Sequence, residues 1–212
     1  MNNESILITG MSGFVGHAFI DSLRGEGVDA RGAFQFAEEA EKFEAQGLKT
    51  FIVGDIDGQT EWIQALDGVD VVVHLAARVH MMRDEAEDPL AEYRRVNVEG
   101  TRQLAKAAMA AGVKRFVFLS TIKVNGEETA IDKPFREDDK VDPQDDYAVS
   151  KWEAENILQD FSSQKAFELV VIRSPLVYGP GVKANFKNLI KISSMGCLCH
   201  LRVLTIDAVL FI

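Results

Sequence analysis

Short apolar runs alternate along the chain with segments of helical periodicity. The apolar runs predict strands at Ser5–Thr9, Val28–Phe34, Lys49–Val53, Asp70–Leu75, Arg115–Ser120 and Glu168–Arg173. The segments between them predict helices at Phe14–Leu23, Phe36–Gln46, Thr60–Leu66, Pro89–Ala111 and Asp145–Phe161. The central strands are continuously apolar rather than alternating, which is typical of a parallel sheet covered on both faces. Strand–helix alternation at this spacing therefore predicts an α/β fold with a doubly wound parallel sheet.

Composition narrows the class of protein. The chain has 212 residues, of which 47% are hydrophobic and 26% charged, as in globular proteins that build a core without disulfides. A net charge of −10 argues against nucleic acid and against an anionic membrane surface as partners. The first residues lack the basic and apolar regions of a secretion signal, and no apolar run reaches the length of a membrane span. We therefore expect a cytoplasmic protein.

Only two cysteines occur, Cys197 and Cys199, and they form no disulfide framework. No Cys/His set has the spacing of a zinc site, so we expect no bound metal.

A glycine-rich segment follows the first expected strand and opens the first expected helix. It contains Gly10, Gly13 and Gly16 in a G-x-x-G-x-x-G spacing. Glycine allows the backbone to approach a pyrophosphate closely, and a helix N-terminus offers free N–H groups to an anion. The same glycines would also suit a tight turn without any ligand.

Two further motifs carry candidate chemistry. Tyr147 and Lys151 are four residues apart in an expected helix and so share one face. A neighbouring ammonium group favours the phenolate form, so we expect Lys151 to lower the pKa of Tyr147 and suit it to acid–base chemistry. Ser120 and Thr121 end an expected strand, at the edge where doubly wound sheets bind ligands. Taken alone, each motif also has an ordinary structural explanation.

Together with four other segments, these motifs resemble the extended short-chain dehydrogenase/reductase family, in its nucleotide-sugar epimerase/dehydratase group. The segments are Gly54-Asp55-Ile56, His74-Leu75-Ala76-Ala77, Asn97-Val98-Glu99-Gly100-Thr101 and the run from Arg173 to Gly181. The resemblance covers residues 5–192. It implies a Rossmann-like NAD(P)-binding domain at residues 1–175 and an incomplete substrate-binding region at residues 176–212.

The resemblance also implies roles for individual residues. Thr121, Tyr147 and Lys151 would be catalytic. The residues that would contact the cofactor NAD are Gly10, Gly13, Phe14, Val15, Gly16, Asp55, Ile56, Leu75, Ala76, Ala77, Asn97, Ser120, Tyr147, Lys151, Pro175 and Val177. The residues that would border the nucleotide-sugar substrate are Arg78, Lys123, Asn125, Asn185 and Phe186.

Two departures from the family pattern shape the expected function. The acidic residue that would bind the 2′-hydroxyl of NAD is absent near Phe34 and Gln35, and Arg31 is the nearest cation for NADP. We favour NAD and leave NADP open. Ile122 and Lys123 stand where dehydratases of the family carry an Asp-Glu pair, which argues against a dehydratase.

The expected activity is that of a nucleotide-sugar 4-epimerase acting on a UDP-hexose or UDP-N-acetylhexosamine. A nucleotide-4-keto-sugar reductase and an inactive cofactor-binding module are the alternatives. The resemblance further implies a homodimer and a place in polysaccharide biosynthesis.

The end of the chain departs most from the family. After Ile192 the pattern fades into an apolar stretch, and the chain ends at Ile212, where family members continue. This predicts a truncated product with a tail foreign to the family.

Overall fold

The computed structural model describes residues 4–79, 86–129 and 132–179. The chain divides into two units, residues 1–175 and 176–212. Every helix and strand in the described part of the chain lies in the first unit.

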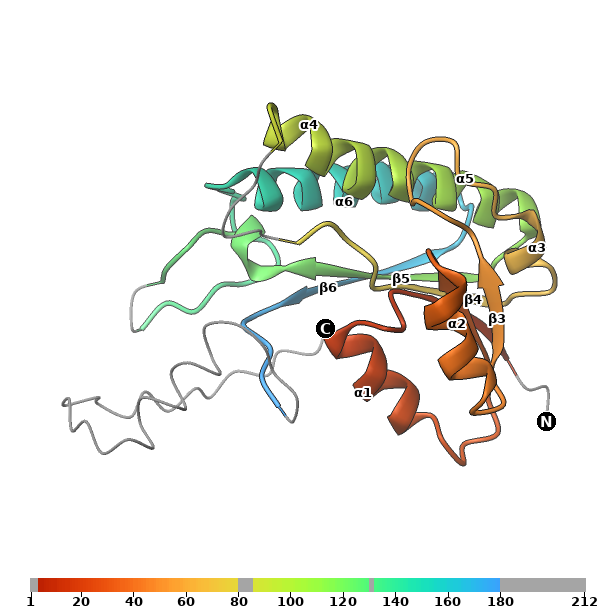
Figure 1. Ribbon diagram of the computed structural model, residues 1–212. Helices are drawn as coiled ribbons and strands as arrows, with labels where there is room; N and C mark the ends of the chain where they lie inside the picture. The colour runs from red at the N-terminus through yellow and green to blue at the C-terminus, as the bar shows by residue number, and fades with distance from the viewer. Residues whose placement is uncertain (1–3, 80–85, 130–131, 180–212) are drawn as a thin grey trace, which may run out of the picture. The chain divides into compact units, whose positions relative to one another are not determined.

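A sheet of six parallel strands forms the centre of this unit (Figure 1). Its strands are β1 (Ser5–Thr9), β2 (Asp29–Phe34), β3 (Lys49–Ile52), β4 (Val71–His74), β5 (Arg115–Thr121) and β6 (Glu168–Ser174). They lie in the order β3-β2-β1-β4-β5-β6, which confirms the predicted doubly wound sheet. The chain runs outward from β1 in one direction and from β4 in the other. The carboxyl ends of β1 and β4 therefore border the crevice in which such sheets bind ligands.

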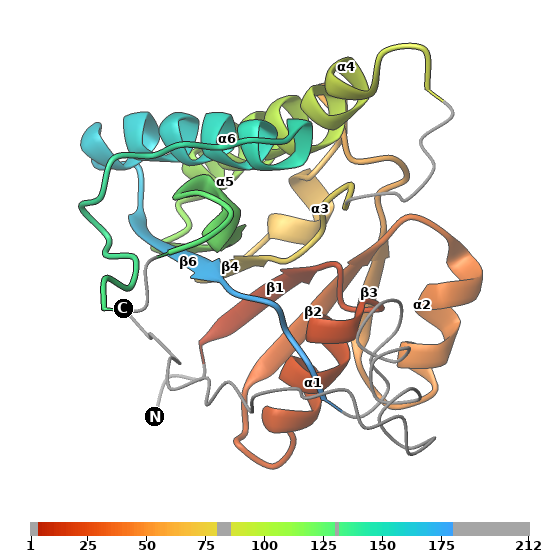
Figure 2. The ribbon, with the colours of Figure 1, turned by 90° about the vertical axis from the view of Figure 1, so that its left-hand side faces the viewer.

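Helices cover both faces of the sheet, as Figure 2 shows. One face carries α1 (Phe14–Ser22) and α2 (Ala37–Glu44). The other face carries α3 (Ile63–Leu66), α4 (Pro89–Tyr93), a π-helical segment (Arg94–Gly100), α5 (Thr101–Ala111) and α6 (Asp146–Ser163). A 3₁₀ turn (Ile122–Val124) follows β5 directly.

The core has two parts, one on each side of the sheet. Neighbouring residues of β1 point to opposite faces, so Leu7 and Ile8 enter different parts although both have 0% of their surface exposed. Trp62 and Phe116 pack with Leu7 beneath α5 and α6, and Phe34 packs with Ile8 beneath α1 and α2. The continuous apolar runs of the sequence follow from this two-sided burial.

Capping residues next to them in the sequence define where α4, α5 and α6 begin or end. Asp145 caps α6, and its carboxylate accepts a hydrogen bond from the Ala148 amide at 2.7 Å. Asp88 caps α4 in the same way through the Ala91 amide at 3.0 Å, with Pro89 as the first helical residue. Gly112 ends α5 in the left-handed conformation, with φ of 75°.

Two predicted helices differ from those observed. The helix expected at Thr60–Leu66 begins only at Ile63, because the Thr60 hydroxyl stabilises a preceding turn by accepting from the Asp57 amide. The helix expected at Pro89–Ala111 is continuous but contains the π-helical segment. In the described part of the chain, no helix is long and apolar enough to cross a membrane.

Candidate functional site

The glycine-rich loop joins β1 to α1 at the crevice. Gly10 has φ of 72°, and Gly13 precedes the first helical residue with no side chain capping the helix. The amides of Phe14, Val15 and Gly16 belong to the first turn, which has no hydrogen-bond acceptors of its own within the helix. No acidic residue lies in this turn. The N-terminus of α1 therefore presents the positive end of the helix dipole, with no carboxylate from its own first turn.

Close backbone packing requires two of the three glycines. A Cβ on Gly10 would lie 2.6 Å from the Ala76 amide nitrogen, so the loop touches the segment that leaves β4. A Cβ on Gly16 would lie 2.3 Å from the Gly10 carbonyl oxygen. Both spacings are too short for a real Cβ, so the loop geometry depends on glycine at both positions.

The segment that leaves β4 is held against the loop by Thr9. The Thr9 carbonyl accepts from the Leu75 amide at 3.1 Å, and the Thr9 hydroxyl accepts from the Ala76 amide at 3.2 Å. Leu75, Ala76, Ala77 and Arg78 are half-buried along this segment. The predicted cofactor-contacting residues of β4 and of the glycine loop thus lie side by side.

His74 is the last residue of β4, directly before this segment, and its buried side chain has a structural role. Its Nδ1 lies 2.6 Å from the Thr9 hydroxyl and its Nε2 lies 2.9 Å from the Thr101 hydroxyl. Burial, together with the charge of Lys151, lowers the pKa of His74 to about 3. The imidazole is therefore neutral near pH 7 and ties β1 and β4 to α5.

Asn97 lies in the π-helical segment, and its side-chain amide forms hydrogen bonds with other residues of the protein. Its Oδ1 accepts from the Arg78 amide at 2.8 Å, and its Nδ2 donates to the Arg78 carbonyl at 3.0 Å and to the Ser150 hydroxyl at 2.9 Å. Three residues later, a Cβ on Gly100 would lie 2.6 Å from a methyl group of Ile56. These contacts hold the segment after β4 in place and allow the helix to approach the Asp55–Ile56 loop.

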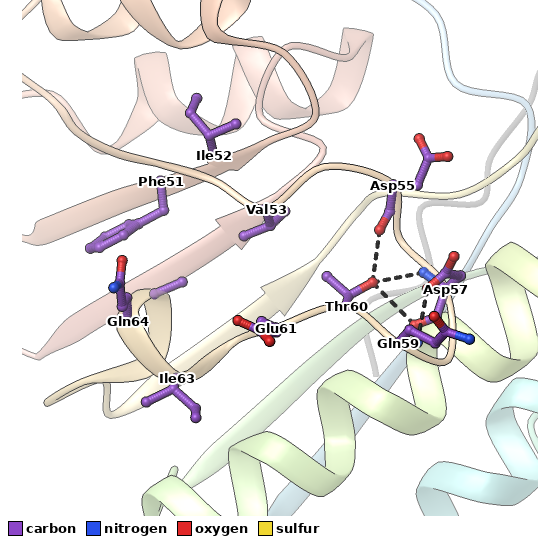
Figure 3. Close-up of a pocket in the computed structure, with 11 residues that line it drawn as sticks. Phe51, Ile52, Val53, Asp55, Asp57, Gln59, Thr60, Glu61, Ile63 and Gln64 are labelled. Carbon is purple, nitrogen blue, oxygen red and sulfur yellow. Dashed lines mark hydrogen bonds between the residues drawn. The ribbon is translucent and has the colours of Figure 1, made fainter.

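Asp55 follows β3 and points away from the turn that Thr60 stabilises (Figure 3). Its carboxylate accepts a hydrogen bond from the Gln35 side chain, which links it to the end of β2. A cavity of about 600 Å³ lies beside it along β3 and α3, with Phe51, Thr60 and Ile63 in its wall. Arg31, the nearest cation to the end of β2 in the sequence, is bound to Asp29 and to the Asp67 carbonyl.

The two hydroxyl side chains at the end of β5, those of Ser120 and Thr121, make different contacts. Ser120 donates to the carboxylate of Glu155, whereas the Thr121 hydroxyl caps the 3₁₀ turn by accepting from the Lys123 amide at 3.3 Å. The Lys123 ammonium lies 2.6 Å from the carboxylate of Asp145, the cap of α6. This ion pair links the turn after Thr121 to the start of α6, which carries Tyr147.

Asn125, predicted near the substrate, is only 5% exposed. Its side chain accepts from Arg173 at 3.0 Å and donates to the Arg136 carbonyl at 3.3 Å. Its contacts thus lie within the protein.

Tyr147 and Lys151 share one face of α6, but the expected effect of Lys151 on the pKa of Tyr147 is not seen. Burial, with smaller contributions from Asp145 and Tyr93, raises the pKa of Tyr147 to about 12. Lys151 is 1% exposed, and its Nζ lies 3.9 Å from the centroid of the Phe118 ring. Burial lowers the pKa of Lys151 to about 7. The prediction of a lowered pKa for Tyr147 is therefore wrong for this structure, because desolvation dominates.

The remaining predicted residues lie at or beyond the end of β6. Pro175 is exposed directly after β6, and Val177 belongs to the second unit with 41% of its surface exposed. Asn185 and Phe186 lie outside the described residues. Among the described residues, no group of three or more His, Cys, Asp or Glu side chains could hold a metal ion.

Sequence reasoning did not select Glu155, which is 1% exposed and contacts both Ser120 and Arg173. Its position four residues after Lys151 was the available signal, because that spacing places both side chains on one helix face.

Comparisons with known proteins agree with this arrangement. The model of the "NAD dependent epimerase/dehydratase family" matches residues 6–203, which extends past Ile192, where the sequence pattern was expected to fade. A UDP-glucose 4-epimerase of Vibrio cholerae is 45% identical over 194 residues, covering 91% of this chain and 58% of that protein. An N-acetyl-alpha-D-glucosaminyl-diphospho-ditrans,octacis-undecaprenol 4-epimerase of Escherichia coli O157:H7 is 31% identical, covering 89% of this chain and 54% of that protein.

A solved structure is also similar, that of the UDP-glucuronic acid 4-epimerase of Bacillus cereus in complex with UDP-glucuronic acid and NAD. It has a TM-score of 0.76 and 27% identity, and the match covers 90% of this chain and 63% of that one. The chain thus spans little more than half the length of the relatives it matches.

Proposed function

The chain belongs to the NAD dependent epimerase/dehydratase family, and we propose that it acts as an NAD-dependent nucleotide-sugar 4-epimerase. Tyr147 and Lys151 share a face of α6, and α6 is linked through Lys123 to the Thr121 end of β5. This link between the helix that carries Tyr147 and Lys151 and the strand end that carries Thr121 is the observation that carries the proposal.

The glycine loop suits the pyrophosphate of NAD. The first turn of α1 has free amides, a positive dipole end and no carboxylate. Phe14, Val15 and Gly16 would hold the pyrophosphate through their backbone. Leu75, Ala76 and Ala77 border the same crevice. When bound, NAD supplies an acceptor and donor of hydride at its nicotinamide ring.

Tyr147 is the proposed acid–base residue at the sugar 4-oxygen. As a phenolate it takes the proton of the 4-hydroxyl, and as a phenol it returns a proton when the 4-keto sugar is reduced from the other side. Thr121 would donate a hydrogen bond to the same oxygen. Lys151 would orient the cofactor ribose.

The proposed substrate is a UDP-hexose or UDP-N-acetylhexosamine. The Vibrio cholerae relative is named for UDP-glucose, which supports the uridine nucleotide. Arg78 and Lys123 are the proposed cations near the substrate. Both follow strands of the sheet, β4 and β5, and doubly wound sheets bind ligands at the carboxyl ends of their strands, which supports this proposal.

A coupled assay tests the function. We expect purified protein to bind NADH saturably and to interconvert UDP-glucose and UDP-galactose, or their N-acetylated forms, with no net consumption of cofactor. Stoichiometric consumption of NADH or NADPH would instead identify a keto-sugar reductase. Cofactor binding without turnover of any sugar nucleotide would identify a binding module.

We also propose a homodimer in the cytoplasm that contributes to polysaccharide biosynthesis. The family resemblance supports a dimer through the long continuous helix that contains Asn97 and through α6, both of which are present here. Light scattering of the purified protein tests it, and a monomeric mass would contradict it.

A further inference from the structure

Glu155 is a carboxylate almost completely removed from water, with 1% of its surface exposed. It lies on α6 one turn after Lys151 and on the same face of that helix. A buried carboxylate is costly unless charges and hydrogen bonds compensate its lost hydration. No step of the proposed reaction uses Glu155, so its burial beside Lys151 calls for a separate explanation.

Side chains from β5 and β6 compensate Glu155. The Ser120 hydroxyl donates to its Oε1. The Arg173 guanidinium donates through Nη2 to Oε2 at 2.7 Å and through Nε to both oxygens at 3.2 Å. The Ser174 hydroxyl also donates to the Ser120 carbonyl at 3.2 Å. This buried network joins α6 to the ends of β5 and β6, directly before Thr121.

The same carboxylate favours the charged form of Lys151. Burial lowers the pKa of Lys151 to about 7, whereas the negative charge of Glu155 acts in the opposite direction. The ammonium otherwise faces the Phe118 ring, whose attraction for a cation is weaker than that of an anion.

Other titratable or charged groups lie on the elements packed around Lys151. His74 at the end of β4 is neutral near pH 7, and Tyr147 on α6 is a phenol. Arg173 on β6 is positive and shares the charge of Glu155. Glu155 is therefore the anion that acts on Lys151 among these groups.

We propose that Glu155 is a positioning residue: its buried carboxylate holds Lys151 as an ammonium ion and anchors the hydroxyl-bearing end of β5. The effect of Glu155 on catalysis rests on the proposed epimerase function. The charge relation itself is independent of that function and is tested on the cofactor-free protein.

Two substitutions provide the test: one removes the negative charge of Glu155, and the other removes the positive charge of Arg173. The titration of Lys151 is followed by NMR of isotope-labelled lysine, with its resonance assigned by its loss in Lys151→Met. Glu155→Gln removes the anion, and we expect the pKa of Lys151 to fall by about one unit or more. Arg173→Met leaves the anion unshared, and we expect that pKa to rise. A merely structural role would disturb both variants without this reversal of sign.

Glu153→Gln is the matched control, because Glu153 lies on the same helix and pairs with exposed Arg94. We expect it to leave the Lys151 titration unchanged. Shifts of Lys151 in one direction in both test variants, or no shift in either, would overturn the proposal. If Glu155→Gln fails to fold by circular dichroism, Arg173→Met is compared with the double variant Glu155→Gln/Arg173→Met. A higher Lys151 pKa in Arg173→Met supports the proposal, and equal values overturn it.

Activity supplies a second readout. We expect the alkaline limb of the epimerase pH profile to move to lower pH in Glu155→Gln by the same amount as the Lys151 titration. Opposite NMR shifts in a protein that binds no NADH would refute the proposed function but support the charge relation. NADH binding with an unmoved Lys151 would refute only the role of Glu155.

Discussion

The carbonyl oxygen of Gly10 lies 2.3 Å from the position that a Cβ atom on Gly16 would occupy. The backbone of the glycine loop therefore packs closely against itself, and it also packs against the segment after β4. A side chain at position 16 must move the Gly10 carbonyl, and with it the turn that aims the α1 amides into the crevice.

We therefore expect Gly16→Ala to reduce NADH affinity at least tenfold and to destabilise the protein by about 1–3 kcal/mol through overpacking. Gly58→Ala is the control, because its Cβ would meet only the Glu99 side chain at 3.6 Å, an ordinary contact. NADH fluorescence titration and urea unfolding measure the two effects. Equal affinities for both variants would show that the loop tolerates a Cβ.

Tyr147→Phe removes the proposed acid–base hydroxyl while keeping the ring. We expect turnover to fall roughly a hundredfold to ten-thousandfold, with NADH binding unchanged. Tyr93→Phe is the control, because its ring lies 6.1 Å from that of Tyr147 and its hydroxyl donates only to the Val79 carbonyl among the bonds described. Comparable losses in both variants would argue against a specific role for Tyr147.

His74 predicts a dependence of stability on acid. Its folded-state pKa of about 3 lies below its ordinary value of 6.5. Between these values the unfolded chain binds a proton that the folded protein does not, so this contribution is complete above pH 6.5 and is lost as the pH falls toward 3. We expect His74→Gln to be less stable at pH 7 but to lose less stability over that range. Urea unfolding at each pH measures this dependence, and an equal dependence on pH in His74→Gln and the unchanged protein would contradict the account.

The neighbourhood of β2 predicts a preference for NAD. Arg31 is engaged by Asp29 and the Asp67 carbonyl, and Glu39 accepts a hydrogen bond from Ser12 of the glycine loop at 3.2 Å. A 2′-phosphate would add negative charge near that carboxylate. We expect NADPH to bind at least tenfold more weakly than NADH, about 1.4 kcal/mol, as measured by fluorescence titration.

Glu39→Arg should narrow this difference between the cofactors, whereas Glu41→Arg, at an exposed position further along α2, should not. A preference unchanged by Glu39→Arg would show that another group discriminates.

Much of the fold was predictable because hydrophobic periodicity is local. Leu7 and Ile8 belong to a run that is apolar on both faces, which only a doubly covered strand requires. The start of α6 was visible for the same reason, since Asp145 caps a helix whose first residues follow it in the chain. The prediction that a helix begins at Thr60 was wrong because the Thr60 hydroxyl forms hydrogen bonds within a turn. Helical periodicity carries no information about such side-chain bonds.

The sequence by itself determined the strand and helix order, the glycine loop, and the spacing that places Tyr147 and Lys151 on one helix face. These features depend on residues that are near one another in the chain. Only the tertiary structure decided the protonation tendencies of that pair and the neutrality of His74, because desolvation depends on which distant strands cover a side chain. It also decided that Asn97 holds the Arg78 backbone and that Glu155 meets Ser120 and Arg173. Such contacts join residues up to tens of positions apart, and their energies exist only when the sheet and α6 are packed together.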